Sequence, residues 1–105
     1  MAVREIDPRG LSEQALLILV SLAGGPKHGY AMIQDIAQVS GRRLGPGTLY
    51  GAIARLERGG LIEPLPADER RIPYRLTEAG ARHLGAELSG LRRVAATGLR
   101  RLAAP

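Results

Sequence analysis

The side chains best suited to chemistry in this sequence lie on one predicted helix, residues 46–58, and they suit contact with a polyanion. Pro46 favours a helix start, because the N–H group that it lacks would have no partner there. One side of the helix is apolar at helical spacing and predicts contact with a core; it consists of Leu49, Ile53 and Leu56. The opposite side is small and basic; it consists of Gly47, Gly51, Ala54, Arg55 and Arg58. Such a face can approach a polyanion closely, as a recognition helix does in a DNA groove, although an ordinary surface helix with incidental arginines has the same pattern.

Two short strands are predicted after this helix. Gly59-Gly60 ends the helix, and residues 61–65 and 71–77 are strand-like runs on either side of a polar loop, which predicts a β-hairpin. A two-stranded hairpin is marginal by itself, so it must pack against the helices. Helix, turn, helix and charged hairpin form the order of a winged helix, with Arg70 and Arg71 at the tip of the wing.

The N-terminal half supplies the other helices. Residues 1–10 resemble a loose arm that holds Arg4 and Arg9. Ser12 is a suitable N-cap for a helix that runs to about residue 23. This helix is apolar nearly all round, so other parts of the protein must cover it on more than one side. A second subunit is one source of that cover. The next helix is expected from about residue 30 to 39. Arg42 and Arg43 follow it, and they are equally compatible with phosphate contact and with two solvated loop charges.

The C-terminal segment predicts one long helix, from the N-cap Thr77 to about Ala103. At about 1.5 Å per residue it would span roughly 38 Å, more than a compact domain of this size, so its far end must protrude. A protruding helix with an apolar stripe needs a partner helix, whereas a frayed tail is the alternative. We therefore expect a homodimer whose contacts come from this stripe and from the first helix. The expected contacts are Leu16, Leu19, Leu84, Leu88, Leu91, Ala95, Leu99 and Leu102.

Composition narrows the function classes. The chain has 105 residues, which suits one domain, and no cysteine, which excludes disulfides and thiolate chemistry. No apolar run is long enough for a membrane span and no signal-peptide pattern is present, so we expect a cytoplasmic protein without membrane contact. The net charge of +5 and pI near 10.7 favour an anionic partner such as nucleic acid, although a GC-rich genome would also enrich arginine.

Residues for catalysis or metal binding show no suggestive arrangement. The two histidines are His28 and His83, and no carboxylates stand at ligand spacing around them. No serine lies in a nucleophile elbow, and the glycine pairs end helices rather than cradle phosphates. We expect neither an enzyme nor a bound metal or cofactor, and we expect His28 to bond locally at a helix start.

Four motifs, in this order and at this spacing, resemble the PadR family of transcriptional regulators from about Leu11 to Leu84. They are Lys27-His28-Gly29-Tyr30, Gly47-Thr48-Leu49-Tyr50, residues 56–62 (Leu-Glu-Arg-Gly-Gly-Leu-Ile) and residues 74–80 (Tyr-Arg-Leu-Thr-Glu-Ala-Gly). The resemblance implies a mostly α fold with a small β-hairpin, namely a winged helix-turn-helix with a long C-terminal dimerisation helix. It also implies that Tyr30, Thr48 and Tyr50 lie near DNA, and that the protein is a dimeric repressor, often released by a small molecule. Many relatives carry a Gly-Arg-Pro-Arg-Lys-Tyr-like wing, from which Arg70-Arg71-Ile72-Pro73-Tyr74 departs.

These observations combine into one prediction. Residues 1–77 form an arm and a DNA-binding domain, and residues 78–105 form a dimerisation helix. The partners are an inverted-repeat operator in double-stranded DNA, a second copy of the chain and, where one exists, a small apolar effector. The alternative is a winged-helix module for protein–protein contact without specific DNA binding. The expected DNA contacts are Lys27, Tyr30, Arg42, Arg43, Thr48, Tyr50, Arg55, Arg70 and Arg71.

Overall fold

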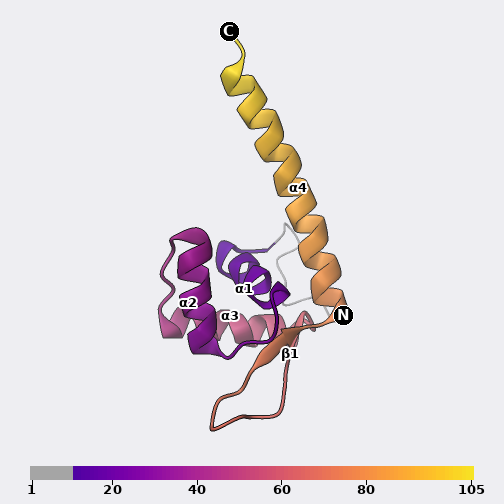
Figure 1. Ribbon diagram of the computed structural model, residues 1–105. Coiled ribbons are helices and arrows are strands. Elements are labelled where there is room, and N and C mark those ends of the chain that lie inside the picture. Colours follow the sequence, from indigo (N-terminus) through magenta and orange to yellow (C-terminus); the bar gives the residue numbers. More distant parts are fainter. Residues whose placement is uncertain (1–10) are drawn as a thin grey trace.

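The computed structural model describes residues 11–105, so the expected arm with Arg4 and Arg9 lies outside the described residues. The elements are α1 (Glu13–Ala23), α2 (Gly29–Ser40), α3 (Pro46–Arg58), β1 (Ile62–Pro64), β2 (Tyr74–Leu76) and α4 (Glu78–Ala103). Figure 1 shows α1, α2 and α3 gathered beside the first turns of α4, with the hairpin projecting below them and the rest of α4 running away in the opposite direction. The mostly α fold with a small hairpin and a long C-terminal helix is therefore confirmed.

Local signals set the beginnings of the helices. The Ser12 hydroxyl accepts a hydrogen bond from the Ala15 N–H at 3.1 Å, as expected of the N-cap of α1. Nδ1 of His28 faces the Ala31 N–H at 3.4 Å and caps α2, which confirms the expected local role of this histidine. Pro46 stands in the first turn of α3, where a missing N–H costs nothing.

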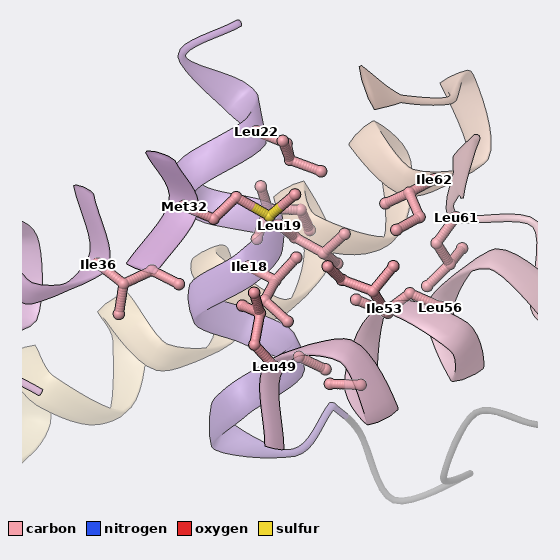
Figure 2. Packing of buried hydrophobic residues seen from close by; sticks show 13 residues of the cluster. Ile18, Leu19, Leu22, Met32, Ile36, Leu49, Ile53, Leu56, Leu61 and Ile62 are labelled. Atoms are coloured by element: carbon pink, nitrogen blue, oxygen red, sulfur yellow. The ribbon is translucent and has the colours of Figure 1, made fainter. Parts of the chain in front are cut away.

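The apolar core lies where α1, α2, α3 and the start of β1 meet. Figure 2 shows the side chains from these elements pointing toward one another. The expected inner face of α3 is confirmed, because Leu49, Ile53 and Leu56 are 0%, 2% and 1% exposed. The largest fully buried side chains are Ile18, Leu19, Met32, Ile36, Leu49, Leu56, Leu61 and Ile62.

Two residues expected at the dimer interface belong to this core instead. Leu19 is 0% exposed and Leu84 is 5% exposed within a single protomer. A side chain with almost no free surface cannot contribute much contact to a second subunit, so the expectation is wrong for these two. Leu16 is half-buried against the core, whereas Leu88 and Leu91 are 41% and 44% exposed.

The hairpin is a short antiparallel pair that is extended by the segment before α2. Its register pairs Ile62 with Leu76 and Glu63 with Arg75, and the last two side chains form an ion pair with Nε and Oε2 2.6 Å apart. The Lys27 N–H donates to the Tyr74 carbonyl at 3.1 Å, and the Tyr74 N–H donates to the Lys27 carbonyl at 2.9 Å. The root of the wing is thereby fixed to the N-terminal end of α2.

The start of α4 is fixed to the turn that follows α3. The Thr77 hydroxyl accepts from the Gly80 N–H at 3.0 Å and donates to the Gly60 carbonyl at 2.7 Å. A Cβ atom on Gly80 would overlap the Leu61 carbonyl oxygen and stand 3.0 Å from its carbon. Only glycine allows this close approach, which explains why the Leu-Thr-Glu-Ala-Gly motif ends in glycine at position 80.

α4 is the longest element, with 26 residues. Its first turns contact α1 and β2, and Figure 1 shows the remainder leaving the body of the domain. Within residues 11–105, neither α4 nor any other helix combines the length and the apolar character that crossing a membrane requires.

Candidate nucleic-acid interface

The outer face of α3 is exposed and carries the small and basic residues that the sequence placed there. Thr48 and Arg55 are exposed, and Tyr50 is 50% exposed. Leu49 and Leu56 anchor the opposite side of the helix in the core at 0% and 1% exposure. Because the inner side is fixed, the outer side is presented to solvent in one defined orientation.

Tyr50 lies against the N-terminus of α2. A Cβ atom built on Gly29 would stand 2.6 Å from Cζ and 2.9 Å from Cε1 of the Tyr50 ring. These distances are far below ordinary contact, so the ring occupies the space that the missing side chain leaves. The contact explains why the His-Gly-Tyr and Gly-Thr-Leu-Tyr motifs, which lie apart in the sequence, form one surface.

The wing, α2 and α3 enclose a cleft of about 350 Å³, which we call the tyrosine cleft. All three tyrosines of the chain line it, and its lining contains no carboxylate. Burial raises the pKa of the Tyr74 phenol, and the negative charge of Glu57 adds to this rise. The charged and polar side chains of the cleft are His28, Tyr30, Tyr50, Arg70, Arg71 and Tyr74.

The tip of the wing is a two-residue turn. Asp68 and Arg71 exchange backbone hydrogen bonds of 2.7 and 2.8 Å, and Glu69 and Arg70 between them have φ values of 50° and 72°. Positive φ at both central residues is typical of the type I′ hairpin turn, which normally uses asparagine and glycine. Behind the tip, Nη1 of Arg71 lies 3.2 Å from Nε2 of His28. The wing arginine therefore reaches the N-terminus of α2.

Lys27 does not line the tyrosine cleft, although it lines a neighbouring cavity together with His28 and Arg71. Its Nζ donates to the Ser21 carbonyl at 2.5 Å and lies 3.4 Å from the Gly25 carbonyl. Ser21 lies in the last turn of α1 and Gly25 follows directly after the C-cap Gly24, where a cation is stabilised by the helix dipole. The ammonium group therefore has a structural partner at the end of α1, and its expected contact with DNA stays a prediction.

Arg42 and Arg43 stand beside the start of α3. With Thr48 they line a second depression of about 270 Å³. Nη1 of Arg42 is 2.8 Å from Oε2 of Glu13, and both side chains are at least half exposed, at 63% and 50%. An exposed pair of this kind is worth about 0–1 kcal/mol, so a phosphate group can compete for the arginine.

The predicted site residues therefore fall into separate groups. Tyr30, Tyr50, Arg70 and Arg71 meet in the tyrosine cleft. Arg42, Arg43 and Thr48 meet in the second depression, whereas Arg55 stands exposed farther along α3. His28 was expected only as a helix cap; its contact with Arg71 was missed, because the two residues lie 43 positions apart. The presence of His28 in a recognisable motif was the one available signal.

Comparisons with known proteins agree with this geometry. Residues 18–86 match the transcriptional regulator PadR-like family. The chain is 48% identical over 83 residues to an uncharacterized 37.1 kDa protein in transposon TN4556 of Streptomyces fradiae, covering 79% of this chain and 24% of that protein. It is 32% identical over 69 residues to the transcriptional activator GvpE2 of Halobacterium salinarum, covering 66% of this chain and 35% of that protein. The chain thus spans about a quarter to a third of the length of these curated relatives.

Solved structures show the same arrangement of elements. A transcriptional regulator from Clostridium thermocellum has a TM-score of 0.74 and 26% identity, covering 87% of this chain and 90% of that chain. A PadR family transcription regulator from Clostridium difficile R20291 has a TM-score of 0.76 and 24% identity, with 88% and 100% covered. A PadR-like transcriptional regulator from Bacillus cereus has a TM-score of 0.76 and 21% identity, with 87% and 92% covered. The last two likenesses concern the fold alone.

Proposed function

This chain belongs to the PadR-like family of transcriptional regulators, and we propose that it binds a specific operator in double-stranded DNA as a homodimer. The observation that carries the proposal is the arrangement of the exposed face of α3, the tyrosine cleft and the wing arginines on adjoining elements. Helix and wing of a winged helix contact DNA together, the helix in the major groove and the wing at the backbone beside it. A net charge of +5 supports the same partner.

Recognition of bases is expected to be sparse on this face. Among the exposed side chains of α3 that carry hydrogen-bonding groups, Thr48, Tyr50 and Arg55 are the expected DNA contacts. Gly47 and Gly51 admit the backbone to the groove but offer no side chain to a base edge. Sequence preference therefore rests partly on DNA shape, with Arg55 as the main candidate for a direct contact.

The dimer is proposed to form through α4. Leu88 and Leu91 are 41% and 44% exposed, and Leu99 and Leu102 are 68% and 85% exposed on the part of the helix that leaves the domain. Apolar side chains at this spacing on a protruding helix pack against a second helix. A two-fold dimer presents two α3 helices, which calls for an inverted-repeat operator.

Repression is the proposed consequence of binding. A dimer that covers a promoter excludes polymerase by overlap, whereas activation needs a further contact with the transcription machinery. For a small-molecule effector, the expected place is between α1 and α4 of the dimer, where the side chains are aliphatic. All three tyrosines line the tyrosine cleft, and the chain has no Trp or Phe, so an effector clamped between aromatic rings is not expected.

Salt dependence separates this proposal from a winged-helix module for protein–protein contact. Affinity for a mixed-sequence duplex is measured by fluorescence anisotropy over a series of salt concentrations. Phosphate neutralisation releases counterions, so the logarithm of affinity should fall linearly and steeply with the logarithm of salt concentration. Tyr50→Ala and Arg55→Ala should weaken binding, while Arg92→Ala removes one charge from α4 as the control. A flat salt response, or equal losses in all three variants, would favour the alternative.

A further inference from the structure

In the tyrosine cleft, the His28 ring and the Arg71 guanidinium group face each other as two hydrogen-bond donors, with no acceptor between them. Nδ1 of His28 lies 3.4 Å from the Ala31 backbone nitrogen, and Nε2 lies 3.2 Å from Nη1 of Arg71. A neutral imidazole has one donor and one acceptor nitrogen, and a guanidinium group has donors only. The ring can therefore accept from Ala31 or from Arg71, but not from both.

The helix cap decides which of the two contacts is the hydrogen bond. The first N–H groups of α2 have no partner within the helix, and Nδ1 of His28 is the side-chain acceptor that serves one of them. When Nδ1 accepts, Nε2 carries the proton and faces the Arg71 guanidinium as a second donor. Two donors of this kind, one of them charged, are the complement of an anionic oxygen.

The surroundings of these donors favour an anion on the tyrosine side. The tyrosine cleft adds Arg70 and the N-terminal end of α2, whose dipole is positive. Asp68 and Glu69 line a neighbouring cavity of about 230 Å³, which shares His28 and Arg71 but none of the tyrosines. The two carboxylates of the wing thus line the neighbouring cavity and not the tyrosine cleft itself.

We propose that one DNA phosphodiester binds in the tyrosine cleft and accepts hydrogen bonds from Nε2 of His28 and from Arg71 together. The inference rests on the proposed function and deepens it, because it assigns His28 as a DNA contact and makes α2 and the wing two halves of one phosphate site. Arg71 loses nothing when it turns to the phosphate, since the capping tautomer of His28 offers it no acceptor. Tyr30 and Tyr50 line the same cleft, and their hydroxyl groups are candidate donors to the other phosphate oxygens.

His28→Asn separates the two roles of the ring. Asparagine is among the best N-caps, so the variant retains an acceptor for Ala31, but it lacks Nε2. His83→Asn is the matched control, because it changes the other histidine of the chain, which lies on α4. Thermal unfolding of both variants should match that of the wild type.

The test is a double-mutant cycle with Arg71→Ala on a mixed-sequence duplex over a series of salt concentrations. His28→Asn and Arg71→Ala should each weaken binding about tenfold, the effect of one charge-assisted hydrogen bond. Arg71→Ala should also flatten the salt slope by about one unit. Because both groups hold one phosphate, the double variant should lose much less than the product of the single losses.

The possible results distinguish this inference from the function on which it rests. A wild-type protein that does not bind duplex DNA refutes the proposed function. Wild-type binding that His28→Asn leaves unchanged, or losses that multiply fully in the double variant, overturn the shared phosphate site alone. Inorganic phosphate, titrated at constant ionic strength, should not displace the duplex at low millimolar concentration; displacement that requires His28 would assign the cleft to the free anion instead.

Discussion

Replacing Gly29 with alanine should weaken DNA binding while leaving the domain folded. The new methyl group would stand 2.6 Å from Cζ and 2.9 Å from Cε1 of Tyr50. Carbon atoms in contact lie about 3.5–4.0 Å apart, so the ring must retreat by about 1 Å or turn away. Tyr50 is 50% exposed, which leaves it free to turn outward and lose its position on the proposed DNA face.

The stability of the variant follows from two opposing effects. Overpacking costs about 1–3 kcal/mol in a rigid site, but outward rotation of a half-exposed ring relieves most of it. Alanine in place of glycine in a helix recovers up to about 1 kcal/mol. The free energy of unfolding should therefore fall by about 0–2 kcal/mol. Loss of one hydrogen bond from Tyr50 to DNA corresponds to about 1 kcal/mol, or roughly fivefold in affinity.

Anisotropy titrations of Gly29→Ala, Tyr50→Ala and the double variant test this reasoning, with circular dichroism to check folding. If Gly29 affects DNA binding only by positioning the ring of Tyr50, the double variant should bind DNA with the same affinity as Tyr50→Ala alone. Gly85→Ala is the control, because a Cβ on Gly85 meets no atom within 4 Å; it should bind as the wild type does. Wild-type affinity in Gly29→Ala, or losses that simply add, would refute the placing role.

Other predictions concern the wing, the dimer, the core and the effector. Arg70→Ala with Arg71→Ala should reduce affinity on all sequences and flatten the salt slope by up to about two units; an unaltered slope would mean that the wing does not contact DNA. Leu91→Glu with Leu99→Glu should place charges on the exposed stripe of α4 and give monomers in sedimentation velocity, whereas a dimer profile would move the interface elsewhere. Gly80→Ala should lower the free energy of unfolding by at least about 2 kcal/mol, because backbone and not a movable side chain blocks its methyl group; a thermal midpoint equal to that of the wild type would contradict this. Planar cationic dyes should bind weakly, and tight saturable binding that releases DNA would overturn the expectation of an aliphatic effector site.

The fold was predictable because its signals are local. Ser12 and Thr77 were recognised as caps, since the hydroxyl serves an N–H three residues away in the same segment. The inner face of α3 was predictable from the helical spacing of its apolar residues, and Leu49 and Ile53 are buried as expected. Such features depend on neighbours in the chain, which the sequence displays directly.

The missed features depend on segments that meet only in space. Periodicity placed Leu19 and Leu84 on apolar faces, but it could not show whether their cover came from the same protomer. Lys27 was expected to contact DNA, and the sequence did not show that the end of α1 holds its ammonium group. The type I′ turn at the tip of the wing was also missed, because Glu69 and Arg70 are not among the residue types that usually adopt positive φ in such turns.

The central claim is that a two-fold dimer of this chain reads DNA through paired α3 helices. Selection of binding sites from a pool of random-sequence duplexes tests it most directly. The account predicts an enriched inverted repeat whose half-site centres lie about one helical turn, roughly 34 Å, apart. A pool without enrichment, an unpaired half-site or a direct repeat would contradict it.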